Sequence, residues 1–164
     1  MSFLSFELGE IMITAADVED AQREWGDGIV RIAAAYERGD DYTAVATKHV
    51  EQLYAYDLSE VLFKPTMASK EQFRPTFEGA LSYFVASNNA CKEDTGFAIK
   101  GWTSVEFENS GIIVNKINAI AMGNYFFTGS DGSKTKVEYT FGYIRDDAGK
   151  LRIVLHHSSL PAAL

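Results

Sequence analysis

Cysteine is almost absent from this chain, in which Cys91 is the only thiol. A single cysteine excludes an internal disulfide framework and a cysteine-rich zinc site. It fits a reducing compartment, and we expect a cytoplasmic protein. The first residues contain no basic segment followed by an apolar one, and no run approaches the roughly 20 apolar residues that cross a bilayer. We therefore expect neither a secretory signal nor a membrane span.

Basic residues are also few, with 15 Lys and Arg against 23 Asp and Glu and a formal net charge of -8. Proteins that bind nucleic acids or anionic membranes use Lys and Arg to neutralise phosphates. We therefore expect no nucleic-acid partner and no attachment to a membrane surface. A glycine-rich phosphate loop is missing too, because Gly26 and Gly28 lie within a helical pattern.

The 164 residues are enough for one domain with a substantial core, and we expect a single domain over residues 1–164. Apolar residues make up 46% of the chain and aromatic residues 13%. This composition is typical of a globular protein and argues against disorder. The aromatic content predicts a core rich in rings.

The first half of the chain has the period of amphipathic helices. Thr14 and Asp17 form the pattern of a helix N-cap with an acid three residues later, and Gly39 suits the end of that helix. Two further helices are predicted at about 42–54 and about 70–86, the second with Phe73 on its apolar face. Between them lies a short apolar run that ends at Pro65, which is compatible only with an edge strand or a strand end.

From Gly96 onward the apolar period changes to two, which is typical of strands. Residues 129–133 form a hairpin turn, and residues 146–149 lead into a last strand over 151–161. Helices followed by a meander of antiparallel strands indicate an α+β fold. We expect a strongly curved antiparallel sheet wrapped around the N-terminal helices, which would leave a cone-shaped cavity lined by aromatic rings.

The last strand ends in two histidines and two serines. Neighbouring side chains of a strand point to opposite faces. Strict alternation from the apolar start of the strand places His157 and Ser159 on the inward face, and His156 and Ser158 on the outward face.

A metal site is not predicted by these histidines. His156 and His157 point to opposite faces and do not easily share one ion, and zinc needs three or four protein ligands. The only other histidine is His49, on a predicted helix; a carboxylate could complete a site, but none is placed by spacing.

Acid/base chemistry is the alternative use of the inward pair. Histidine titrates near neutral pH, so His157 could exchange a proton beside Ser159. The simpler interpretation, which the residues alone favour, is a histidine bonded to a backbone carbonyl. Thr66, after Pro65, and Tyr83, beside the stripe of the third helix, could each face a cavity, although each alone is more often structural.

Five long segments stand in a distinctive order along the chain: Leu62-Phe63-Lys64-Pro65-Thr66, Glu93-Asp94-Thr95-Gly96-Phe97-Ala98-Ile99, Gly123-Asn124-Tyr125-Phe126-Phe127-Thr128, Lys136-Val137-Glu138-Tyr139-Thr140-Phe141-Gly142-Tyr143 and His156-His157-Ser158-Ser159-Leu160-Pro161. The order of elements resembles the nuclear-transport-factor-2-like (NTF2-like) cone fold and is similar to the oligomerisation domain of calcium/calmodulin-dependent kinases. Within that superfamily, these segments resemble the iota class of carbonic anhydrases. The resemblance covers the chain from about Asp17 on.

This resemblance implies reversible hydration of CO2 to bicarbonate, without a metal or other cofactor, in a small apolar cavity. Other members have been described as metal-dependent. The residues it implies for catalysis are Thr66, Tyr83 and Ser159, with His157 on their predicted face. The family often has a third histidine where this chain has Leu155, and that departure favours a metal-free site. A homodimer is also expected.

Two other functions remain open at this point. A polyketide-cyclase or ketosteroid-isomerase-like enzyme on the same fold needs an inward carboxylate as base, and none is evident in the sequence. A non-catalytic assembly module would pair subunits through the outward sheet face, for which Trp102, Glu138, Thr140 and Arg152 are the predicted residues.

Overall fold

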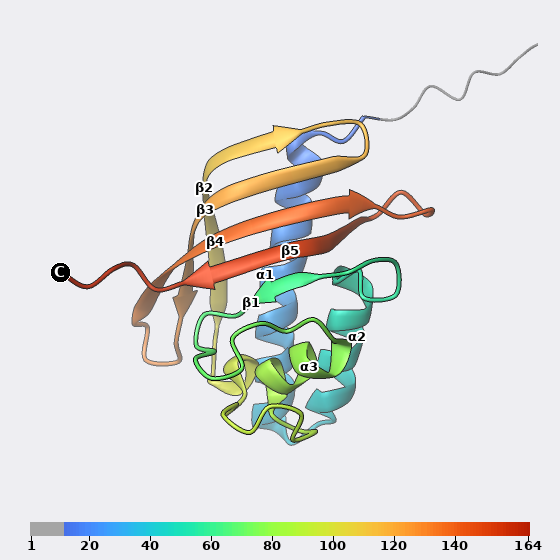
Figure 1. The fold of residues 1–164 in the computed structure, drawn as a ribbon. Helices are drawn as coiled ribbons and strands as arrows, with labels where there is room; N and C mark the ends of the chain where they lie inside the picture. The colour runs from blue at the N-terminus through green and yellow to red at the C-terminus, as the bar shows by residue number, and fades with distance from the viewer. Residues whose placement is uncertain (1–11) are drawn as a thin grey trace, which may run out of the picture.

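A computed structural model describes residues 12–164. Its elements, in chain order, are α1 (Ala15–Arg38), α2 (Tyr42–Leu53), β1 (Leu62–Lys64), α3 (Phe77–Val85), the 3-10 helix η1 (Phe97–Ile99), β2 (Ser104–Val114), β3 (Asn118–Thr128), β4 (Lys134–Arg145) and β5 (Leu151–Ser159). The sheet order is β1-β5-β4-β3-β2. Figure 1 shows α1 crossing one face of the sheet, with α2 and α3 beyond the edge formed by β1.

The sheet confirms the expected α+β architecture and adds one feature. Strands β2 to β5 form the predicted antiparallel meander, and the hairpin between β3 and β4 spans residues 129–133. β1 pairs with β5 in the parallel direction, so the sheet is mixed and is not closed. The short β1 lies at the edge, as Pro65 requires.

Helix α1 forms where the sequence predicts it. The Thr14 hydroxyl accepts the Asp17 N–H, and the Asp17 carboxylate accepts the Thr14 N–H, which completes a capping box. Gly39 ends the helix with a φ of 74°, a left-handed conformation that favours glycine. The buried stripe of α1 carries Trp25 into the core, where the indole packs against rings from α2, α3 and the sheet.

Helix α3 begins at Phe77, later than the predicted residue 70. Pro75 lacks an N–H and disfavours a helical conformation in the residue before it, so the helix cannot extend backward through this point. Thr76 caps the first turn by accepting the Gly79 N–H at 3.1 Å. Phe73, expected on a buried helix face, lies in the preceding loop with 70% of its surface exposed.

A β-bulge in β5 reverses the predicted faces of the last strand. Ile153 pairs with Tyr143 of β4 and Leu155 with Gly142, so Val154 has no partner in β4. After this extra residue the alternation changes phase. His156 and Ser158 are buried, whereas His157 is exposed and Ser159 is half-buried. The expectation that His157 and Ser159 face inward is therefore wrong, because it assumed strict alternation along the strand.

Two residues predicted for the outward sheet face lie elsewhere. Arg152 is buried, and its guanidinium donates to the backbone oxygens of Glu51 and Tyr54 at the end of α2. Trp102 is half-buried before β2, where its indole N–H donates to the Phe97 carbonyl at 2.7 Å. Both side chains hold elements together instead of presenting a surface.

Gly28 lets α1 approach α2. A Cβ at this position would lie 2.1 Å from His49 Nδ1, and the buried His49 ring is held between Trp25 and Phe84. We expect Gly28→Ala to lower the free energy of unfolding by about 1–3 kcal/mol, despite a gain of up to about 1 kcal/mol in helix propensity. Urea denaturation would measure the change.

The matched control is Gly111→Ala in β2, where a Cβ would meet nothing within 4 Å. This change should stay within about 0.5 kcal/mol of the wild type. In the double variant Gly28→Ala/His49→Ala the cost should be smaller than the sum of the single costs. Additive costs would contradict the predicted clash.

Candidate active site

Three buried or half-buried hydroxyl groups meet between β1, β3 and β5. Thr66 follows β1, Tyr125 lies in β3 and Ser158 lies in β5. Ser158 Oγ is 2.6 Å from Thr66 Oγ1 and 2.5 Å from the Tyr125 hydroxyl. It also lies 3.2 Å from the Glu138 carbonyl, to which it can donate. Ser158 is therefore the centre of the cluster, and it has three possible acceptors within reach of its single hydrogen.

A pocket of about 270 Å³ lies beside this cluster. Thr66 and Tyr83 supply hydroxyl groups to its lining, and Phe97, Trp102 and Val137 supply apolar walls. This volume accommodates a molecule as small as CO2 together with water. Ser158 bonds Thr66 but does not itself line the pocket, so it can influence the pocket only through the threonine.

Tyr83 is the part of α3 that reaches the pocket. Its ring is buried and packs against Phe63 and Phe97, and its hydroxyl accepts the Met67 N–H at 3.3 Å. Burial raises the pKa of Tyr83 to about 12, although hydrogen bonds with Met67 and Thr66 lower it in part. The phenol therefore stays protonated at neutral pH and can donate a hydrogen bond into the pocket.

His156 connects the hydroxyl cluster to the core. Its Nε2 lies 3.2 Å from the Tyr125 hydroxyl, and its Nδ1 lies 2.8 Å from the Tyr54 hydroxyl. The ring stacks on Phe63 with 4.8 Å between centroids. Burial is the main cause that lowers the pKa of His156 well below its usual value, with smaller contributions from the other two histidines. The imidazole is therefore neutral at physiological pH.

Lys64 holds the two backbone segments that carry the hydroxyl groups. Its Nζ lies 3.3 Å from the carbonyl oxygen of Thr66 and 3.3 Å from that of Ser158. Burial lowers the pKa of this ammonium group. The side chain thus ties the loop after β1 to the end of β5 at the point where Thr66 and Ser158 meet.

A buried ion pair shapes the loops around the pocket. Arg74 is 1% exposed, and its guanidinium makes two hydrogen bonds to the Asp94 carboxylate at 2.6 and 2.7 Å. Asp94 also accepts the Ser82 hydroxyl at 2.7 Å. The Asp94 side chain is only 3% exposed and lies in the pocket lining. Because these bonds occupy its oxygens, Asp94 is not the free inward base that a ketosteroid-isomerase-like reaction needs.

The structure brings together two of the four residues predicted for catalysis. Thr66 and Tyr83 both line the pocket, whereas His157 is exposed and Ser159 bonds the Glu138 carboxylate outside the core. Their neighbours His156 and Ser158 take the inward positions. The sequence does not reveal that His156 and Ser158 replace His157 and Ser159 on the inward face. Residues 153–155 are all apolar, so an apolar side chain is buried here whether the strand is regular or contains a bulge.

Tyr125 also belongs to the hydroxyl cluster, although no pattern in the sequence singles it out. Its ring is buried with 1% exposure, while its hydroxyl reaches both His156 and Ser158. The segment Gly123–Thr128 is distinctive in the sequence, yet nothing in it shows which of its aromatic rings carries a hydroxyl to the site.

No three His, Cys, Asp or Glu side chains within residues 12–164 are grouped so that they could hold a metal ion. His156 and His157 point to opposite faces of the sheet, and both ring nitrogens of His49 are buried without a hydrogen-bond partner among the described residues. Over the same residues, no helix is both long and apolar enough to cross a membrane.

The two buried histidines predict a loss of stability in acid. Burial lowers the pKa of His49 to about 3, with a smaller effect of Arg31, and it lowers the pKa of His156 as well. In the unfolded chain both titrate near 6.5, so below that pH the unfolded state binds more protons. The free energy of unfolding should therefore fall by roughly 3 kcal/mol between pH 6.5 and pH 5. Urea denaturation at these pH values is the measurement.

The exposed His157 provides the control for this effect. His157→Gln should keep the same dependence of stability on pH as the wild type. A stability that stays constant from pH 7 to pH 5 would show that the buried histidines are protonated in the folded protein, which contradicts the expectation.

Two comparisons with known sequences point to the same family. The sequence profile of the family described as metal-independent carbonic anhydrase matches residues 16–160. A metal-independent carbonic anhydrase from Nostoc sp. (strain PCC 7120) is 43% identical over 152 residues, which cover 91% of this chain and 74% of the relative.

Solved structures agree with this match. The crystal structure of an iota-carbonic anhydrase from a cyanobacterium, complexed with bicarbonate, has a TM-score of 0.90 and 41% identity, and the match covers 93% of this chain and 95% of the other. A putative calcium/calmodulin-dependent kinase II association domain from Xanthomonas campestris shares the fold with a TM-score of 0.64 at 20% identity, covering 93% and 91% of the two chains. The fold is thus the NTF2-like cone. The chain belongs to the metal-independent carbonic anhydrase family.

Proposed function

We propose that this protein interconverts CO2 and bicarbonate in the pocket lined by Thr66 and Tyr83, with Ser158, Tyr125 and His156 behind them. The observation that carries the proposal is the hydrogen bond between Thr66 and Ser158 beside a pocket, which presents hydroxyl groups to a small reactant. The family match supports the reaction, and the relative with bicarbonate bound supports the substrate class.

The pocket suits both reactants. CO2 is apolar and enters a cavity walled by Phe97, Trp102 and Val137 without losing strong hydration. Water needs hydrogen-bond partners, which the hydroxyl groups of Thr66 and Tyr83 supply. Holding the two reactants in contact lowers the entropic part of the barrier.

The proton of the attacking water must leave, and the buried groups of the site are weak bases. Burial raises the pKa of Tyr125 and Tyr83 and lowers that of His156, so each stays neutral. A relay of hydroxyl groups solves this problem without a charged protein group. As the water oxygen bonds to carbon, its proton passes to Thr66, whose own proton passes to an oxygen of CO2. The product is carbonic acid, which ionises in solution to bicarbonate and a proton.

Ser158 allows Thr66 to act either as a hydrogen-bond acceptor or as a donor toward the pocket. When the Ser158 hydrogen points to the Glu138 carbonyl at 3.2 Å, Thr66 donates to Ser158 and its free lone pair accepts from water. When the Ser158 hydrogen points to Thr66 at 2.6 Å, Thr66 donates its hydrogen to an oxygen in the pocket. A rotation of one hydroxyl therefore changes the site from binding water to stabilising the oxygens of the product.

For assembly, we propose a homodimer formed through the outer face of the sheet. Ile113 of β2 and Ile120 of β3 are opposite each other in register, and Met122 follows on the same strand; all three are exposed. Exposed apolar patches of this kind mark interaction sites. We also propose a cytoplasmic location, because Cys91 is a free thiol.

The two adjacent serines of β5 test the site directly. Ser158→Ala should lower the kcat of CO2 hydration by roughly 10²-fold, because Thr66 loses its partner at the point where charge develops. Ser159→Ala is the matched control, with the same atom removed on the other face, and it should retain nearly full activity. Stopped-flow CO2 hydration measures both. The reverse result, with Ser159 essential and Ser158 dispensable, would refute the assignment of the inward face.

Chelation tests whether the hydroxyl groups are sufficient. A relay through Thr66 and Ser158 needs no Lewis acid, so we expect CO2 hydration to be unchanged after exhaustive treatment with a chelator, with elemental analysis of the same sample. Activity that disappears on chelation and returns with one added ion would contradict the proposed chemistry.

A further inference from the structure

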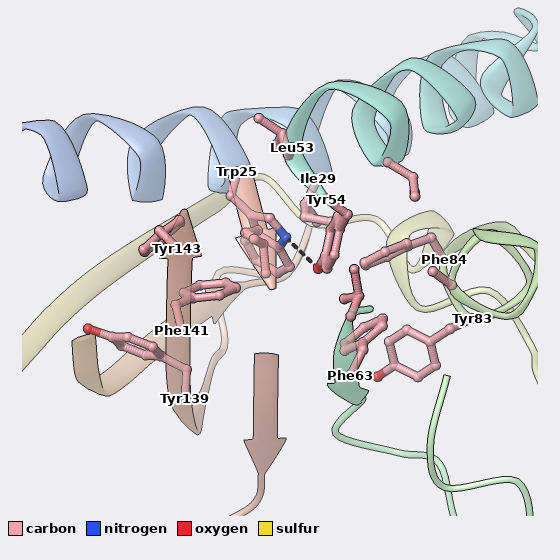
Figure 2. Close-up of a cluster of buried hydrophobic side chains, with 14 of the residues drawn as sticks. Trp25, Ile29, Leu53, Tyr54, Phe63, Tyr83, Phe84, Tyr139, Phe141 and Tyr143 are labelled. Carbon is pink, nitrogen blue, oxygen red and sulfur yellow. Dashed lines mark hydrogen bonds between the residues drawn. The ribbon is translucent and has the colours of Figure 1, made fainter. Parts of the chain in front are cut away.

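A continuous chain of hydrogen bonds runs from the core to the pocket. Trp25 Nε1 lies 3.0 Å from the Tyr54 hydroxyl, and Tyr54 lies 2.8 Å from His156 Nδ1. Beyond His156 the chain continues through Tyr125 and Ser158 to Thr66. Figure 2 shows the indole nitrogen of Trp25 directed at the Tyr54 hydroxyl. Trp25 and Tyr54 are each 1% exposed, so water does not compete for these bonds.

The groups at the inner end of this chain determine which group donates in each of its hydrogen bonds. An indole N–H can only donate, so Trp25 donates to Tyr54. The Tyr54 hydroxyl has two neighbours, Trp25 and His156, and only the imidazole can accept its hydrogen. In the opposite arrangement His156 Nδ1–H would donate to Tyr54, and the buried Tyr54 hydrogen would have no acceptor, which is costly.

The bond with Tyr54 also determines which nitrogen of His156 donates to the next group. A neutral imidazole carries one hydrogen, and if Nδ1 accepts from Tyr54 that hydrogen is on Nε2. His156 Nε2 donates to Tyr125, and Tyr125 donates to Ser158. Ser158 accepts at one side and keeps its own hydrogen free for Thr66 or the Glu138 carbonyl.

We propose that Tyr54, with Trp25 behind it, is a positioning residue that fixes the Nε2–H tautomer of His156 and keeps the Ser158 hydrogen free for Thr66 or the Glu138 carbonyl. This role rests on the proposed function of the Thr66 pocket. It assigns no contact with CO2 or water to Tyr54, which acts through His156, Tyr125 and Ser158. In the reversed chain Ser158 would donate to Tyr125, and Thr66 could no longer receive a hydrogen from it.

The same arrangement closes the inner end of the chain to proton transfer. The indole N–H of Trp25 does not accept a proton, so a proton that reached Tyr54 could not continue along this route. Burial raises the pKa of Tyr54 well above its usual value, which keeps its hydroxyl protonated. A proton therefore does not leave the site along this route, and carbonic acid carries both of its hydrogens out through the mouth of the pocket.

The first test is the tautomer of His156 in the unmodified protein without substrate. The chain has only three histidines, and ¹⁵N NMR distinguishes a protonated from an unprotonated ring nitrogen. Spectra of the variants His157→Gln and His49→Gln, each of which lacks one imidazole, assign the NMR signals of the three rings. The expected result is a hydrogen on Nε2 and a bare Nδ1. A hydrogen on Nδ1 would overturn the proposal, whatever the activity of the protein.

The second test compares two buried tyrosines that differ in the hydrogen bonds of their hydroxyl groups. Tyr54→Phe should lower kcat about tenfold with a smaller change in KM, because the reactants still bind while the hydroxyl cluster loses its fixed direction. Tyr143→Phe is the control, since the Tyr143 hydroxyl is buried and has no hydrogen-bond partner among residues 12–164. Its activity should equal that of the wild type.

The outcomes separate this role from the proposed function. If Tyr54→Phe keeps full activity and an unchanged His156 spectrum, Tyr54 has no positioning role although the pocket is the site. If Tyr54→Phe unfolds, the tautomer of the wild type still decides the question. If the wild type does not hydrate CO2, the proposed function fails, and the positioning role fails with it.

Discussion

The β-bulge at Val154 is the constraint on which the whole site depends. One extra residue in β5 turns every following side chain to the opposite face, so it decides that His156 and Ser158 point into the core. The bulge lies where β5 changes its neighbour at the sheet edge: Ile153 accepts the Ala55 N–H at 2.9 Å, and pairing with β1 begins at Leu155. Arg152, one residue earlier, ties the strand to the end of α2. The register is thus held on both sides of the bulge.

The second consequence of this register is a buried cluster of polar groups that are all uncharged. The polar atoms of Tyr54, His156, Tyr125 and Ser158 lie among aromatic rings, where an unpaired polar group would be costly. Each of them has a hydrogen-bond partner within the cluster, and burial shifts the pKa of every titratable member toward its neutral form. Hydrogen bonds between such neutral groups are stronger in a medium of low dielectric than they are in water.

The pocket itself is built by loops on this rigid base. Pro75 delays the start of α3, and the freed segment carries Arg74 to its buried ion pair with Asp94. Breaking such a pair from one side would leave a buried charge, which is expensive. Lys64 bonds the carbonyl oxygens of Thr66 and Ser158, and together with this ion pair it holds the loops that place Thr66 and Tyr83 around a space for small reactants.

Local sequence patterns predict the elements, and the long motifs predict the family. Thr14 and Gly39 mark the ends of α1, and the change of apolar period near Gly96 precedes the strands of the sheet. The resemblance carried by the long motifs implies a carbonic anhydrase and points to Thr66 and Tyr83, which both line the pocket. The inward residues of β5 depend instead on contacts between segments that are distant in the chain. Ile153, Val154 and Leu155 are all apolar, so the sequence pattern is equally compatible with a regular strand and with a bulge. The choice depends on β4, β1 and the end of α2, whose hydrogen bonds to β5 are made far apart along the chain.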